Sequence, residues 1–122
     1  MPYENVNQII LHPKNDGIMQ LQNNVLYIDF NNDTYLIPRG FETDGASIPK
    51  VFWSIIGSPF KGQYLYAALI HDYLCKMGVD GTPKASRKVT NKIFYNCMRY
   101  YGVGRCKAKM MYWAVKVGAP KW

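Results

Sequence analysis

The order in which strand-like and helix-like segments follow one another constrains the fold of this chain more than any other feature. In the first 40 residues, short runs of β-forming residues are separated by turn residues, and the runs 25–30 and 34–37 flank Asn31-Asn32-Asp33 as in a hairpin. After residue 50, apolar residues recur at helical spacing between glycine and proline breaks. Strands followed by helices predict an α+β fold, in which an N-terminal antiparallel β-hairpin or meander packs against three to four C-terminal helices.

Length and composition predict a single domain over residues 1–122, because no linker or internal repeat divides a chain of this ordinary size. We expect a β-rich part over 1–40, a loop over 41–50 and a helical part over 51–118. The chain is 48% hydrophobic, which is enough for a core. No apolar run approaches the roughly 20 residues of a membrane-spanning helix, and the N-terminus does not resemble a secretory signal.

Glycine, proline and serine set the expected boundaries of the elements. Pro13 should end a strand over 8–12, because proline cannot donate to a strand ladder. Gly78 should end a helix over 63–77, and the Ser86 side chain should cap the next helix.

Apolar spacing also predicts which side of the last two helices is buried, because residues three and four apart share a helix face. The expected core residues are Val89, Ile93, Phe94, Cys97, Met98 and Tyr101, followed by Cys106, Met110, Trp113, Ala114 and Val117. The cysteines Cys75, Cys97 and Cys106 are irregularly spaced. We therefore expect reduced core residues rather than a disulfide framework or a cysteine zinc site.

The distribution of charge is more informative than the formal net charge of +7. All eight acidic residues lie within the first 80 positions, whereas residues 84–122 contain ten Lys and Arg and no acid. Such a segment suits a nucleic acid, an anionic lipid or an acidic protein, and it is also compatible with two solvated helix faces. Lys88, Lys92 and Arg99 are the candidate contact residues. Tyrosines beside them could stack on bases, although the chain contains no recognised nucleic-acid motif.

Two segments could carry chemistry. The first is His71-Asp72 within an apolar helical run, where both side chains need polar partners because unpaired burial costs several kcal/mol. They would form either a reactive site or a satisfied structural pair. The second is the loop from Thr43 to Ser47. Asp44 could bind a hard cation or orient His71, Gly45 allows close backbone approach, and an ordinary helix-capping turn is the alternative.

Two blocks of sequence, Phe41-Glu42-Thr43-Asp44-Gly45-Ala46-Ser47-Ile48-Pro49 and Ala67-Ala68-Leu69-Ile70-His71-Asp72-Tyr73-Leu74, resemble a family of small phage and prophage proteins of unknown function. The likeness covers about residues 35 to 118 and includes Ser86-Arg87-Lys88. It implies a phage or prophage origin and brings no known reaction.

The helical part is also similar to the catalytic hairpin of phospholipase A2 enzymes, in which a His-Asp pair on one helix faces a second helix. That resemblance implies a general base at His71, a calcium ligand at Asp72 and an orienting residue near Asn91. Asn91 departs from the family, where this position is an Asp. The calcium loop of the family is absent unless Thr43-Asp44-Gly45 replaces it, and the disulfides are missing.

These observations leave two functional hypotheses. The leading one is a phage or prophage accessory protein that acts by binding, as a virion component or an inhibitor of a host or defence protein, in the host bacterial cytoplasm or the virion. The alternative is a small hydrolase with His71 as general base. In that hypothesis Asp44 and Asp72 orient His71 or hold a metal such as calcium or zinc.

Overall fold

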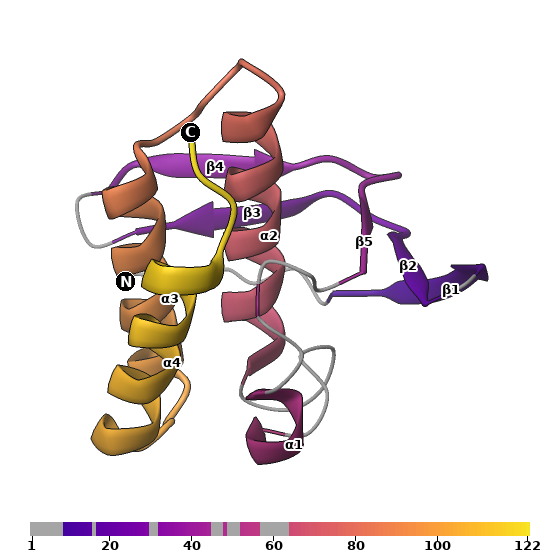
Figure 1. Cartoon of the computed structure of the whole chain (residues 1–122). Coiled ribbons are helices and arrows are strands. Elements are labelled where there is room, and N and C mark those ends of the chain that lie inside the picture. The colour runs from indigo at the N-terminus through magenta and orange to yellow at the C-terminus, as the bar shows by residue number, and fades with distance from the viewer. Residues whose placement is uncertain (1–8, 16, 30–31, 45–47, 49–51, 57–63) are drawn as a thin grey trace. The chain divides into compact units, whose positions relative to one another are not determined.

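A computed structural model of the chain describes residues 9–15, 17–29, 32–44, 48, 52–56 and 64–122, without the side chains of residues 55 and 56. The chain divides into two compact units, Met1–Asp44 and Gly45–Trp122, named here the strand unit and the helical unit. The strand unit contains antiparallel strands and the helical unit contains the helices, so the α+β class is confirmed (Figure 1). The single-domain organisation stays a prediction.

The strand unit contains two small antiparallel sheets. The hairpin of β3 (Val25–Ile28) and β4 (Thr34–Ile37) pairs Val25 with Ile37 and Ile28 with Thr34, where the sequence predicts a hairpin (Figure 1). The other sheet has the order β1-β2-β5, with β1 at Leu11–Asn15, β2 at Ile18–Leu21 and β5 at Glu42–Thr43.

Two sequence expectations about this second sheet are wrong. Pro13 does not end a strand but lies inside β1, opposite Met19. Its missing N–H is tolerated because β1 is at the edge of the sheet. Residues 42 and 43 were expected in a loop but form β5, which pairs with β2. A two-residue strand is too short to leave a periodic signal in the sequence.

The helical unit contains α1 (Trp53–Ile56), α2 (Leu65–Val79), α3 (Arg87–Tyr100) and α4 (Arg105–Gly118). Helix α3 packs against both α2 and α4 (Figure 1). Its buried side chains include Ile93, Phe94, Cys97 and Met98, as their spacing predicts. Ser86 caps α3 as expected, since its hydroxyl accepts a hydrogen bond from the Val89 N–H at 3.1 Å. None of the described helices is long and apolar enough to cross a membrane.

The packed face of α4 differs from the face that apolar spacing predicts. Buried residues include Ala108, Met111 and Val115, whereas Trp113 is 58% exposed and Val117 is 71% exposed. Four other side chains are also more exposed than expected: Val89, Tyr101, Cys106 and Met110. Cys75 and Cys97 are buried but Cys106 is exposed, so the expectation of three core cysteines is wrong for Cys106.

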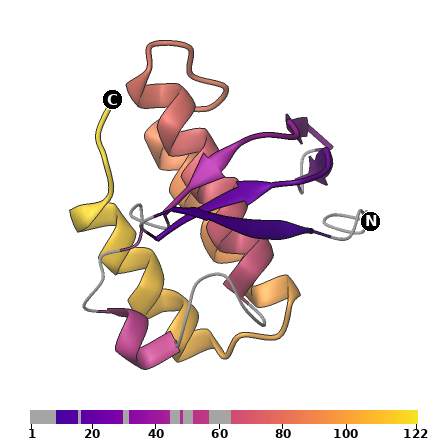
Figure 2. The ribbon, with the colours of Figure 1, turned by 90° about the vertical axis from the view of Figure 1, so that its right-hand side faces the viewer.

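Gly78 does not end α2, because the helix continues through Val79 to a cap at Asp80. The C-terminal segment instead returns to this end of α2, beside the loop that leads to α3 (Figure 2). A Cβ atom at residue 78 would overlap the indole ring of Trp122, whose Nε1 donates to the Ala85 carbonyl oxygen at 3.3 Å. Gly78 is therefore required for close approach of this ring rather than for a turn.

The Arg87 guanidinium joins the start of α3 to the end of α4. Its Nε donates to the Pro120 carbonyl oxygen at 3.0 Å. Its Nη2 lies 3.2, 2.7 and 3.2 Å from the carbonyl oxygens of Val115, Lys116 and Ala119. A cation at a helix C-terminus satisfies carbonyls that lack intrahelical partners and favours the negative end of the helix dipole. Arg87 therefore fixes how α3 and α4 lie together.

Candidate functional site

His71 lies on the side of α2 that faces α3 and is 0% exposed. Its Nε2 is 2.8 Å from Asn91 Oδ1 on α3, and its ring centroid is 4.8 Å from that of Phe94. One helical turn later on α2, the Cys75 Sγ lies 3.7 Å from the same Nε2. The imidazole thus joins α2 to α3 from within the core of the helical unit.

The pKa of His71 is lowered to about 4, mainly by burial; the hydrogen bond with Asn91 opposes this shift, and the positive charge of Arg87 adds to it. The imidazole is therefore neutral at pH 7, and with its proton on Nε2 it donates to the Asn91 amide oxygen. A general base works best when its pKa is near the working pH and when it reaches the substrate. Neither condition is met by an imidazole that is enclosed and has a pKa of about 4.

Asn91 lies where the phospholipase A2 resemblance places an orienting residue, within hydrogen-bond distance of His71. It is 2% exposed and carries no charge, so it holds the ring without stabilising an imidazolium ion.

The next residue after His71, Asp72, is half-buried. Burial, followed by the negative charge of Asp72, raises the pKa of Cys75 to about 12, which keeps this thiol protonated and unreactive.

The loop residues predicted to join His71 lie in or beyond the strand unit. Thr43 is buried in β5 and Asp44 is exposed at the end of that unit, while Gly45 and Ser47 lie outside the described residues. That Asp44 meets His71 stays a prediction, as does a metal site at Asp44 and Asp72. Within the described part of the chain, no group of three His, Cys, Asp or Glu side chains is arranged to hold a metal ion.

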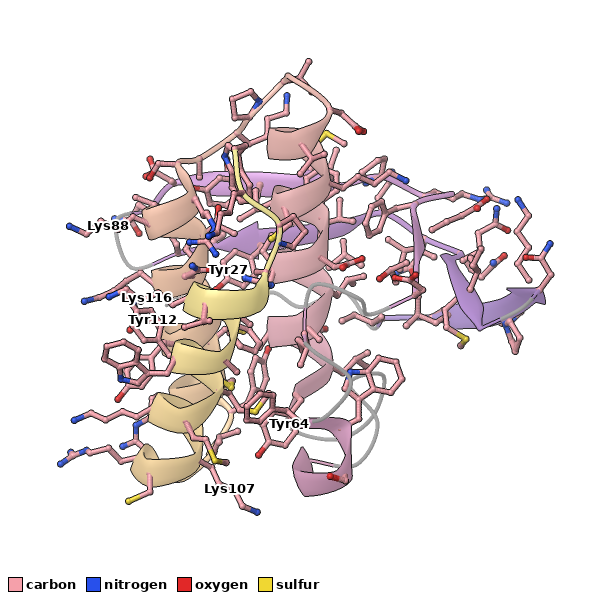
Figure 3. The ribbon with its side chains drawn as sticks, viewed as in Figure 1. Tyr27, Tyr64, Lys88, Lys107, Tyr112 and Lys116 are labelled. Carbon is pink, nitrogen blue, oxygen red and sulfur yellow. The ribbon has the colours of Figure 1, made fainter. Side chains whose placement is uncertain are left out.

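The outer side of α3 and α4 forms a second candidate site, which we name the basic face. Its centre is the pair Tyr95–Tyr112, which packs edge to face across the two helices with ring centroids 5.9 Å apart. Lys88, Tyr112 and Lys116 lie along this side in Figure 3, away from α2. At 100° per residue, six exposed cations fall on the same side of their helices as these tyrosines: Lys88, Lys92 and Arg99 on α3, and Arg105, Lys109 and Lys116 on α4. The structure thus brings together the three predicted contact cations.

Beside the basic face, α4 exposes an apolar surface, the α4 stripe, made of Met110, Trp113 and Val117. Lys116 Nζ lies 4.7 Å above the Trp113 ring, so the two surfaces meet. The stripe borders an open pocket of about 560 Å³, whose lining is almost entirely apolar and consists of Phe52, Met110, Trp113, Ala114, Val117 and Gly118. Apolar spacing in the sequence assigns Met110, Trp113 and Val117 to the core, so this site could not be recognised from the sequence.

Comparison with known proteins identifies the family. Residues 19–115 match the model of a family described as "Protein of unknown function (DUF1353)". The chain belongs to this family. Membership in a family of unknown function, as the sequence blocks suggest, is therefore confirmed.

Two relatives in Sinorhizobium fredii are similar to this chain. The uncharacterized protein y4jT is 44% identical over 105 residues, which is 86% of this chain and 30% of y4jT. The uncharacterized protein y4iH is 35% identical over 96 residues, which is 79% of this chain and 38% of y4iH. The chain thus spans only about a third of the length of these relatives. No solved structure matches the chain.

Proposed function

We propose that this chain is a phage or prophage accessory protein that acts by binding, with the basic face as its contact surface. The carrying observation is that helical spacing places six exposed cations on the side of α3 and α4 that carries the Tyr95–Tyr112 pair, in a segment of 39 positions, 84–122, without Asp or Glu. Such a surface attracts a polyanionic partner, and added salt weakens that attraction. Virion attachment or inhibition of a host protein are the roles that this surface would serve.

The state of His71 supports binding over the hydrolase alternative. A hydrolase using His71, Asp72 and Asp44 requires a substrate to reach an imidazole that is 0% exposed and that, with a pKa of about 4, is only weakly basic. The hydrogen bond with Asn91 and the contact with Phe94 favour a structural role for this residue in holding α2 against α3. We therefore expect His71→Gln to keep the binding activity of the chain.

The test compares two variants of equal net charge. Lys92→Gln with Lys109→Gln removes two cations from the basic face, and Lys14→Gln with Lys76→Gln removes two exposed lysines elsewhere. The probes are fluorescent poly-L-glutamate, a 20-nucleotide oligothymidylate and anionic vesicles, titrated at several salt concentrations. The first variant should bind at least one probe about ten-fold more weakly than the wild type, and the control variant should lose much less affinity for that probe.

Equal losses in the two variants would show that net charge alone drives binding and would sink the proposal. The absence of binding to all three probes would also sink it. Hydrolysis of an ester or phosphodiester substrate that disappears in His71→Gln, with the fold intact by circular dichroism, would instead establish the hydrolase alternative.

A further inference from the structure

We infer that the polyanionic partner is an anionic lipid surface, into which the α4 stripe inserts while the basic face contacts the headgroups. This inference rests on the proposed function and adds the class of partner. Its basis is that a water-exposed apolar stripe and a set of cations share one helix.

The α4 stripe is an apolar surface that runs along one side of the helix. Met110, Trp113 and Val117 follow one another at intervals of three and four residues, so they line one side of α4 over about 12 Å. Trp113 and Val117 are more than half exposed. The pocket beside them offers almost no polar atoms, so an acyl chain could enter it without leaving hydrogen-bonding groups unsatisfied.

Cations flank the stripe on both sides. At 100° per residue, Arg105, Lys109 and Lys116 lie on one side of the stripe and Lys107 lies on the other. Figure 3 shows Lys107 pointing away from the lower end of α4, far from Lys116. Lysine stems can lie along apolar surface while their ammonium groups reach the headgroups. A helix with lysines beside an exposed tryptophan and aliphatic residues is the pattern of helices that lie in a membrane interface.

Other partners suit this combination less well. A nucleic acid would use the cations and tyrosines, but gains nothing from Val117 or from an aliphatic pocket. A second copy of this chain would bring another net charge of +7 against the same cations.

The experiment is co-sedimentation of the full chain with vesicles of phosphatidylcholine alone, and of phosphatidylcholine with an equal amount of phosphatidylglycerol. Binding should require the anionic lipid. Trp113→Ala and Val117→Asn should each weaken binding about ten-fold or more. The matched control is Val79→Asn, because Val79 is also an exposed valine near a helix C-terminus, 55% exposed on α2, and this variant should bind as the wild type does.

A spectroscopic readout separates insertion from surface attraction. The chain contains three tryptophans, Trp53, Trp113 and Trp122. Anionic vesicles should shift the tryptophan emission of the wild type to shorter wavelength, and Trp113→Phe should lose that shift while it still sediments with the vesicles. Retention of the full shift in Trp113→Phe would overturn insertion of the stripe.

Three outcomes separate this inference from the proposed function. Binding to poly-L-glutamate or to the oligothymidylate but not to anionic vesicles would overturn the lipid inference and leave the proposed function standing. Vesicle binding that is unchanged in Val117→Asn and Trp113→Ala would overturn the role of the stripe. Failure to bind any of the three polyanions would overturn both.

Discussion

The buried imidazole of His71 makes the stability of the helical unit depend on pH. The pKa of His71 is about 4 in the folded chain, mainly because of burial, whereas an exposed histidine has a pKa of about 6.5. As the pH falls, the unfolded chain therefore takes up a proton at this residue at a higher pH than the folded chain does. The free energy of unfolding should be insensitive to His71 above about pH 7 and should fall, by at most about 3 kcal/mol, between pH 6.5 and 4.

Urea unfolding at several pH values between 7 and 4 measures this effect. His71→Gln is the reference, since its amide can still donate to Asn91 but does not titrate. Other groups titrate in both proteins, so the effect of His71 is the difference between the two pH profiles. Parallel profiles would show that His71 has an ordinary pKa and is not enclosed as the structure has it.

The effect of Gly78→Ala on the free energy of unfolding should change sign when Trp122 is removed. Gly78→Ala should destabilise the chain by about 1–3 kcal/mol, because the added Cβ displaces the indole of Trp122. In a Trp122→Ala background the same substitution should be neutral or stabilising by up to about 1 kcal/mol, because alanine has a higher helix propensity than glycine. Thermal melts of the four proteins form a double-mutant cycle. An additive cycle would contradict the contact.

At the scale of elements, the joint between α3 and α4 depends on Arg87. Arg87→Lys should lower the free energy of unfolding by about 1–2 kcal/mol, because a lysine ammonium cannot reproduce a planar fork that reaches four carbonyls. Lys88→Gln, at the exposed neighbouring position, should change it by less than about 0.5 kcal/mol. Hydrogen exchange of the Ala119 N–H, which donates to the Val115 carbonyl, reports the same joint locally.

Element type could be predicted from the sequence, but helix orientation could not. The cap at Ser86, the pairing of β3 with β4 and the core residues of α3 follow from local chemistry. Helix α4 carries apolar residues around much of its circumference, so apolar spacing is compatible with more than one buried face. Packing against α3 selects the face with the small side chain of Ala108.

The same limit applies to the candidate sites. A histidine within an apolar helix predicts a polar partner, and the resemblance to phospholipase A2 enzymes pointed to Asn91 as that partner. Nothing local in the sequence shows that the imidazole is enclosed or that Arg87 reaches the end of α4, because both depend on how helices distant in sequence pack together. The basic face was visible as a segment without acids, but its border with the α4 stripe required the orientation of α4.

For the whole molecule, the balance between like charge and exposed apolar surface decides whether chains associate. The net charge is +7 at pH 7, and cations flank the stripe of Met110, Trp113 and Val117. At about 10 mM salt the screening length is roughly 30 Å, so copies repel one another before their stripes meet. At about 1 M salt it falls to roughly 3 Å, and apolar contact is no longer opposed.

The weight-average mass in sedimentation velocity should therefore rise between these two salt concentrations for the wild type. Val117→Lys should stay monomeric at both, because it adds a charge within the stripe, and Val79→Lys is the control that adds the same charge elsewhere and should associate as the wild type does. A mass that falls with salt would mean that ionic contacts, and not the stripe, hold chains together. In that case the apolar surface of α4 would not be the contact between chains.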